Sequence, residues 1–234
     1  MGTTARRRIV RGLVAPTDPA PLRFAIACPE RHASEAGAAA FEAGGNALDA
    51  ALAAAATLAV TYPHNCGIGG DLFAVVRFPD GRAVSVNASG PAARAADPGE
   101  QRTRGPRMPA TGPDPITVPG AVAGWQRLHA LGAALGWDAA FAEARRRAED
   151  GVAVSSSLAA AMQDAAADIA ADAGMSAVFR PGGTLRQPAL ARTLAAIAER
   201  GADELYAGDT GARLVAGLRA RGSRLDTDDL AAFA

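Results

Sequence analysis

The sequence contains no lysine, so all 24 of its basic side chains are arginine, and 24 acidic side chains balance them to a net charge of zero. Nucleic-acid-binding chains usually carry a basic excess, so this balance argues against that class. Two cysteines, Cys28 and Cys66, are too few for a disulfide framework, and we expect both to be reduced and buried. The three histidines have no metal-ligand spacing with these cysteines, so we expect no metal site.

Long apolar runs are also missing. No stretch approaches the ~20 apolar residues that a membrane-spanning helix requires. The arginine run at residues 6–8 precedes a short apolar segment interrupted by Arg11 and Gly12, whereas a signal peptide has an apolar region of roughly 7–15 residues. The sequence therefore predicts a cytoplasmic chain without a membrane segment. We expect residues 1–21 to form a flexible lead-in and residues 22–234 to form the folded region.

Alanine is the abundant residue. It supplies 61 of the 234 positions, whereas leucine, isoleucine, valine and phenylalanine together supply 44. Because the net charge is zero, this composition favours closely packed helices over disorder. A chain of this length is one large domain or two small ones and can bury a sizeable core.

The first part of the folded region predicts one strand and two helices. The apolar run at 24–27 favours the strand, and the pattern at 33–43 favours the first helix. Asn46 is a good N-cap for the second helix, and Asp49 lies in its first turn. The run at 47–60 is almost wholly apolar, so we expect this helix to be buried on all sides.

The next elements are a hairpin and a series of helices. The turn signal at 79–82 lies between two expected strands, at 72–78 and 83–87. Residues 97–115 are rich in proline, glycine and arginine and predict an exposed loop or a disordered stretch. The rest of the chain predicts helices near 121–131, 137–149, 155–172, 187–200 and 209–221. These elements indicate an α/β or α+β fold with a helix-rich C-terminal half.

Three patterns could carry chemistry, and each has a plainer interpretation. The glycine loop at 67–70 lies between a helix and a strand, which is the reverse of the order in a dinucleotide site, so we favour a tight turn. His64 and Cys66 could form a nucleophile pair, but no third member is evident. The arginine run at 145–147 is more typical of a solvated helix face than of an anion site. The residues alone show no complete catalytic set.

A more specific signal comes from short stretches that follow one another along the chain. They are Ala-Ser-Glu-Ala-Gly at 33–37, Gly-Gly-Asn-Ala-Leu-Asp-Ala-Ala at 44–51, Gly-Ile-Gly-Gly-Asp at 67–71, Thr-Val-Pro-Gly at 117–120, Ala-Glu-Asp-Gly at 148–151, Leu-Arg-Gln-Pro at 185–188 with Leu-Ala-Arg-Thr-Leu at 190–194, and Leu-Ala-Ala-Phe at 230–233. Together they resemble the γ-glutamyltranspeptidase family of N-terminal nucleophile hydrolases. The resemblance extends from about residue 24 to the end of the sequence.

The resemblance implies part of a four-layer αββα sandwich that a large and a small subunit build jointly after a precursor cuts itself. The new N-terminal threonine of the small subunit is the nucleophile, and its own α-amine is the base. An acyl-enzyme then passes its acyl group to water or to an amine. No threonine of this chain has the expected context, so we expect no catalytic residue within it, an incomplete C-terminus and no activity alone. The implied partners are the missing small-subunit segment and a small-molecule amide, with no metal or organic cofactor.

One position departs from the family. Ser89 lies where the resemblance places the arginine that holds the α-carboxylate of a γ-glutamyl group. A serine cannot make the bidentate, charge-assisted pair that arginine makes with a carboxylate, and Arg94 lies five residues further on. Ser89 is therefore our candidate substrate-binding residue. Three functions stay open: a γ-glutamyltransferase or glutathione hydrolase of glutathione metabolism, a related amidohydrolase or acylase without γ-glutamyl preference, and a non-catalytic, truncated remnant.

Overall fold

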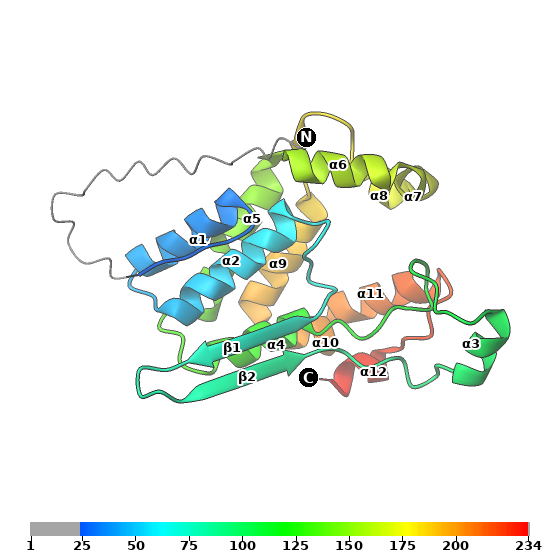
Figure 1. The fold of residues 1–234 in the computed structure, drawn as a ribbon, viewed down its shortest axis with the longest axis horizontal. Coiled ribbons are helices and arrows are strands. Elements are labelled where there is room, and N and C mark those ends of the chain that lie inside the picture. The colour runs from blue at the N-terminus through cyan, green and yellow to red at the C-terminus, as the bar shows by residue number, and fades with distance from the viewer. Residues whose placement is uncertain (1–23, 234) are drawn as a thin grey trace, which may run out of the picture.

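The computed structural model describes residues 24–233, and Figure 1 shows their arrangement. The predicted lead-in at 1–21 lies outside the described residues. The helices are α1 (Arg31–Glu42), α2 (Ala47–Thr61), α3 (Pro98–Arg104), α4 (Ala121–His129), the 3₁₀ helix η1 (Trp137–Phe141), α5 (Ala142–Asp150), α6 (Ser156–Asp164), α7 (Ala166–Ala171), α8 (Ala173–Val178), α9 (Pro188–Arg200), α10 (Asp203–Tyr206), α11 (Asp209–Arg219) and α12 (Thr227–Ala231). The strands are β1 (Leu72–Arg77), β2 (Ala83–Ala88), β3 (Val152–Ala153) and β4 (Thr184–Leu185).

The second helix is largely buried, but not on all sides as its composition predicts, because Ala47 and Ala51 on one face are exposed and Ala55 and Leu58 are partly exposed. The Asn46 side chain accepts a hydrogen bond from the Leu48 N–H at 2.8 Å, and the Asp49 carboxylate accepts one from the Asn46 N–H at 2.8 Å. This reciprocal pair is a capping box, which satisfies amide donors that a helix N-terminus otherwise leaves free. Helix α2 packs between α1, α4 and α5 (Figure 1).

The predicted strand at 24–27 is wrong. These residues belong to no strand, although they lie against α1. Phe24 stacks on Phe41 of α1 with ring centroids 4.4 Å apart, and Ile26 packs against the small cluster between α1 and α2. A Cβ on Gly37 would lie 2.0 Å from the Ile26 side chain, so the segment is held by side-chain packing on a helix.

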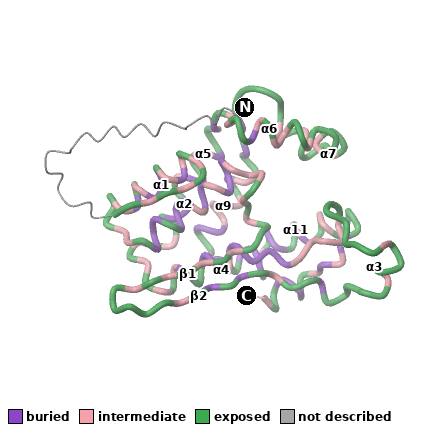
Figure 2. Tube along the Cα trace, in the orientation of Figure 1, coloured by how far each residue is buried: buried purple, intermediate pink, exposed green. Residues whose placement is uncertain are grey.

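The expected loop at 97–115 contains a helix. Asp97 caps α3, and its carboxylate accepts hydrogen bonds from the Gly99 and Glu100 N–H groups. Ion pairs then hold the helix to its surroundings, because Arg104 pairs with Asp114 at 2.7 Å and Arg224 pairs with Glu100. Most of the segment is exposed, as predicted (Figure 2).

The expected helix at 155–172 is divided into α6 and α7, and α8 follows. Asp172 caps α8 by accepting a hydrogen bond from the Met175 N–H at 2.9 Å, which separates α8 from α7. A small antiparallel pair, β3 and β4, lies beside these helices. Val152 of β3 and Leu185 of β4 form a small buried cluster with Leu158 of α6. The sequence pattern missed this pair because each of its strands has only two residues.

The hairpin of β1 and β2 presents two different faces. Strand pairing runs antiparallel from Leu72 opposite Ala88 to Arg77 opposite Ala83. Leu72 and Val76 pack against the main core, whereas Phe73 and Val75 are 69% and 79% exposed. Helix α4 lies against the hairpin (Figure 1).

One large apolar core joins most of the remaining helices. Trp125 of α4 and Trp137 of η1 meet Phe141 edge-to-face, and Leu194 and Ile197 of α9 are fully buried beside them. The buried trace in Figure 2 runs through α2, α4 and α9. The helices in residues 24–233 include none that is long and apolar enough to cross a membrane.

Candidate functional site

The glycine loop at 67–70 forms a turn between α2 and β1, as we predicted. The Gly70 N–H donates to the Gly67 carbonyl at 3.3 Å. The Gly70 carbonyl in turn accepts from the N–H groups of Gly120 and Ala121, at 2.9 and 2.8 Å. These are amide groups at the start of α4, which otherwise have no partner within the helix. The loop therefore attaches the start of β1 to the start of α4.

The end of β2 touches the segment that precedes α4. A Cβ on Gly90 would lie 1.6 Å from the Val118 carbonyl oxygen, and one on Gly120 would lie 1.9 Å from the Ala88 carbonyl oxygen. Both positions require glycine because the opposing atoms belong to the backbone. The Val118 N–H also donates to the Pro91 carbonyl at 2.9 Å. The backbone on either side of Ser89 is therefore fixed from two directions.

The buried Tyr206 is hydrogen-bonded to the backbone on both sides of the start of α4. The Tyr206 hydroxyl donates to the Pro119 carbonyl at 2.8 Å and accepts from the Ala123 N–H at 2.9 Å. Burial raises the pKa of Tyr206 to about 12, so the hydroxyl stays neutral and acts as a structural link. Sequence analysis missed this residue, because its partners lie more than 80 positions away along the chain.

Ser89 lies exposed directly after β2 and is bound to Asp71. The Ser89 hydroxyl donates to one Asp71 carboxylate oxygen at 3.0 Å, and the Gly90 N–H donates to the other at 3.2 Å. The Ser89 N–H donates to the Asn87 side chain at 3.0 Å and closes a local turn. Asp71 was not among our candidates. The register that pairs Leu72 with Ala88 places residues 71 and 89 opposite one another. The strand pairing of the predicted hairpin was therefore the signal that could have identified Asp71 as a neighbour of Ser89.

The Arg94 side chain is paired with an acidic residue of α12. Its guanidinium Nε lies 3.1 Å from the Asp229 carboxylate, and its backbone N–H donates to the same oxygen at 3.1 Å. Burial favours a higher pKa for Asp229, but the hydrogen bonds from Arg94 and from the Asp226 N–H outweigh it and hold the pKa below its usual range. Arg94 therefore joins the chain after β2 to α12.

His64 and Cys66 do not form an activated nucleophile pair. The His64 ring packs on Tyr62 at 4.2 Å, and within residues 24–233 its two buried ring nitrogens have no hydrogen-bond partner. Burial raises the pKa of the Cys66 thiol, whereas a reactive cysteine requires a lowered one. Both cysteines are free, as predicted, but they are partly exposed rather than buried.

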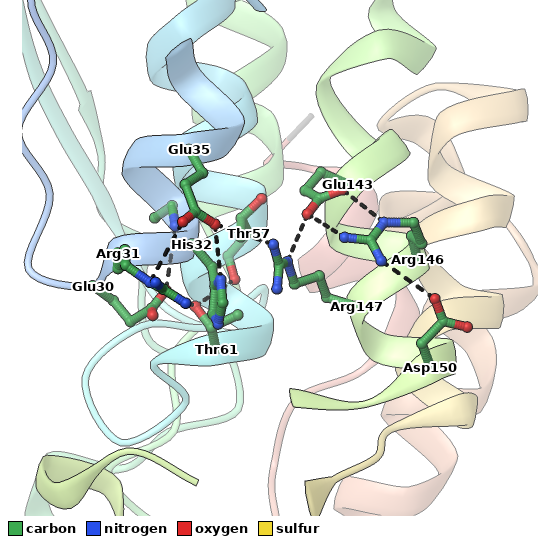
Figure 3. Close-up of polar contacts among 11 residues, drawn as sticks. Glu30, Arg31, His32, Glu35, Thr57, Thr61, Glu143, Arg146, Arg147 and Asp150 are labelled. Carbon is green, nitrogen blue, oxygen red and sulfur yellow. Dashed lines mark hydrogen bonds and ion pairs between the residues drawn. The ribbon is translucent and has the colours of Figure 1, made fainter. Parts of the chain in front are cut away.

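The arginine run belongs to a polar network between α1 and α5 (Figure 3). Arg146 pairs with Glu143 at 2.7 Å and with Asp150 at 3.4 Å. Arg147 pairs with Glu143 at 2.6 Å and reaches Glu35 of α1 at 3.3 Å. The Arg147 side chain is only 16% exposed, so the prediction of a solvated face is wrong at this position. The network fastens α5 to α1.

Figure 3 also shows polar contacts between the start of α1 and the end of α2. Glu30 caps α1 by accepting from the Ala33 N–H at 3.2 Å, and it accepts from the Thr61 hydroxyl at 2.8 Å. His32 pairs with Glu35 at 3.0 Å. Across the residues that the structure describes, no three His, Cys, Asp or Glu side chains form a group that could hold a metal ion.

This architecture is similar to that of known proteins. A sequence model described as "Gamma-glutamyltranspeptidase" matches residues 33–234. The chain is 36% identical over 87% of its length to an oxamate amidohydrolase proenzyme of Klebsiella pneumoniae, and 34% identical over 86% to an acylase proenzyme of Pseudomonas sp. strain SE83. The structure superimposes on the γ-glutamyltranspeptidase of Pseudomonas nitroreducens, complexed with L-DON, with a TM-score of 0.83, at 32% identity and over 89% of this chain.

The fold is that of the N-terminal nucleophile hydrolases, of mixed helix and strand, as the resemblance implied. The chain belongs to the γ-glutamyltranspeptidase family. It spans 41% and 39% of the two relatives named above, and 64% of the matching structure.

Proposed function

We propose that the protein containing this chain cleaves amides through an acyl-enzyme. A threonine outside this sequence attacks the amide carbonyl, the amine leaves, and water or a second amine accepts the acyl group. The observation that carries the proposal is the likeness of the backbone over 89% of this chain to a γ-glutamyltranspeptidase. The chain's own contribution is the scaffold on which β2, the glycine loop and the start of α4 meet.

Ser89 is the proposed substrate-binding residue. It is exposed, its backbone is fixed by the contacts of Gly90 and Gly120, and its hydroxyl is oriented by Asp71. A residue held in this way can position a substrate group, because little conformational freedom is lost when the substrate binds.

Two acyl specificities compete at this site. The first is the γ-glutamyl type, with glutathione as the example, as in the γ-glutamyltranspeptidases of the family. The second is an amide without a γ-glutamyl group, as in an amidohydrolase or acylase. The neutral side chain of Ser89 and the engagement of Arg94 by Asp229 favour the second, because neither residue offers a cation to a substrate carboxylate.

The remaining expectations follow from the same proposal. The implied partner is the small-subunit segment that carries the threonine, and a chain without it is a non-catalytic remnant. The cytoplasmic location and a place in glutathione metabolism stay predictions.

The test compares two preparations. One holds residues 1–234 alone, and the other holds the same residues with the adjoining segment of the reading frame. We expect the longer protein to hydrolyse amide substrates, and we expect the chain alone to show no turnover above a blank. Replacing the candidate threonine with alanine is the control. Turnover by residues 1–234 alone, or a longer protein that cleaves neither γ-glutamyl nor other acyl amides, would contradict the proposal.

A further inference from the structure

Asp71 puts a negative charge beside Ser89. Both carboxylate oxygens accept hydrogen bonds from this turn, one from the Ser89 hydroxyl at 3.0 Å and one from the Gly90 N–H at 3.2 Å. Both Asp71 and Ser89 are exposed, so a small molecule can approach the pair from solvent.

The charge is not compensated nearby. The ion pairs within residues 24–233 include none to Asp71, and Arg94, the first cation after Ser89 in the sequence, is held at α12 by Asp229. The two donors that Asp71 does have, a hydroxyl and an amide N–H, carry no formal charge. A substrate group placed at Ser89 therefore meets a net negative charge.

The pair also has little room to rearrange. Gly90 and Gly120 bring backbone against backbone on the far side of the turn, and Gly70, directly before Asp71, accepts two hydrogen bonds from the start of α4. These contacts fix the backbone at both ends of the Asp71–Ser89 pair, and the two hydrogen bonds from the turn hold the carboxylate beside Ser89. The carboxylate therefore lies on the exposed surface next to Ser89.

We propose that Asp71 determines acyl specificity at this site together with Ser89. Its charge disfavours an acyl group that carries a carboxylate at this position and favours a neutral or positively charged one. The Ser89 hydroxyl donates its hydrogen bond to Asp71, and its oxygen can still accept one, which suits an N–H donor on the substrate. This inference rests on the proposed amide-cleaving function and on the place of Ser89 within that site.

The same contact predicts that an arginine at residue 89 does not by itself create a carboxylate-binding site. A guanidinium introduced by Ser89→Arg has the Asp71 carboxylate as its neighbour and pairs with it rather than with a substrate. Only when Asp71 is also neutralised is the guanidinium free to bind a substrate carboxylate. The two substitutions should therefore be strongly non-additive.

The experiment uses the longer protein that contains the nucleophile and two anilide substrates. One is a γ-glutamyl anilide and the other is the 4-aminobutyryl anilide, which has the same chain and amine but no α-carboxylate. The measured quantity is the ratio of kcat/KM between the first and the second substrate. The variants are Asp71→Asn, Ser89→Arg and the double variant. Asparagine keeps an acceptor oxygen and the shape of the side chain, so the turn is retained.

We expect Asp71→Asn to raise the ratio by about fivefold or more, which is the effect of one charge at about 4 Å even when screened as in bulk water. We expect less than about threefold from Ser89→Arg alone. Added to Asp71→Asn, the same substitution should raise the ratio by about tenfold or more beyond that variant, in line with one charge-assisted pair, so the double variant should exceed the product of the two single effects. Asp80→Asn, in the turn at the other end of the hairpin, is the matched control and should leave the ratio unchanged.

A second readout does not depend on catalysis. In a double-mutant cycle on the melting temperature, Ser89→Arg should be more stabilising, or less destabilising, when Asp71 is present than when it is asparagine. Amide cleavage with an unchanged ratio in Asp71→Asn, or additive effects in both readouts, would overturn the role of Asp71. A longer protein that cleaves no amide would instead overturn the proposed function on which the inference rests.

Discussion

At the residue scale, Glu204 shows how a buried carboxylate contributes to stability. It lies in α10 with only 5% of its surface exposed, and it accepts hydrogen bonds from the Arg200 guanidinium at 2.8 Å and from the Thr210 N–H at 3.0 Å. The hydrogen bond from Arg200, followed by those from Thr210, lowers the pKa of Glu204 to about 2. Because the pKa is lower in the folded state, the ionised carboxylate stabilises the fold.

This linkage predicts how stability depends on pH. The contribution of Glu204 is present above its unfolded pKa of about 4.3, and it is lost as the pH falls toward about 2. We expect Glu204→Gln to lower the free energy of unfolding near pH 7 by about 1–2 kcal/mol, allowing for the half-exposed Arg200. The difference from the unsubstituted chain should shrink toward about pH 2.

Urea unfolding at several pH values measures this effect. Glu199→Gln is the control, because that side chain is 77% exposed and its loss should change stability little. A Glu204→Gln variant whose stability differs from the unsubstituted chain by the same amount at low and neutral pH would contradict the linkage.

At the scale of the secondary-structure elements, Asp49 connects a helix start to a distant loop. Its carboxylate accepts hydrogen bonds from the Asn46 N–H at 2.8 Å and from the N–H groups of Ala134 and Leu135 at 2.9 Å. Burial acts to raise the pKa of Asp49, but these backbone donors outweigh it and lower the pKa. Asn46 itself adds a hydrogen bond to the Gly132 carbonyl at 2.7 Å.

We therefore expect Asp49→Ala to cost more than the loss of an ordinary helix cap. A cap residue replaced by alanine costs ~1 kcal/mol, whereas Asp49→Ala leaves three amide donors without their partner and should cost about 2–4 kcal/mol. Asn46→Ala is the comparison variant, and thermal and urea unfolding give both values. A loss in Asp49→Ala no greater than the ~1 kcal/mol of an ordinary cap would show that the contacts to residues 134–135 contribute little to stability.

At the same scale, local signals predicted most helices correctly. Helices α1, α2, α4, α9 and α11 lie within a few residues of the expected ranges, because caps, glycine stops and apolar spacing act within one or two turns. The expected helix at 137–149 is confirmed too, although its first turn is the 3₁₀ helix η1. The strand predicted at 24–27 failed because a strand requires a neighbouring strand to pair with, and an apolar run of four residues does not specify one.

At the scale of the whole molecule, the outer face of the hairpin carries two large exposed apolar side chains. Phe73 and Val75 point away from the core, and within residues 24–233 β1 and β2 pair only with each other. Exposed apolar side chains on strands with open edges promote association between molecules. We expect residues 1–234, isolated, to self-associate through this face.

The prediction is tested by changing Phe73 and Val75 to serine and threonine together. The double variant should remain monomeric at concentrations where the unsubstituted chain associates, as measured by light scattering, and its melting temperature should change little. Val76→Thr on the inner face is the control, and it should lower the melting temperature because it places a hydroxyl in the core. An unsubstituted chain that is monodisperse at all concentrations would contradict the expected association.

The sequence alone determined the local elements, the family and the mixed class of fold, because caps, turn signals and motif order are written in neighbouring residues. It also located Ser89 as the residue that departs from the family pattern. The tertiary structure alone decided what surrounds that residue. Asp71 reaches Ser89 through strand register, and Arg94 is taken by Asp229, 135 positions further along the chain. Such contacts join segments that are distant in the sequence, so they form only when the backbone around them is folded.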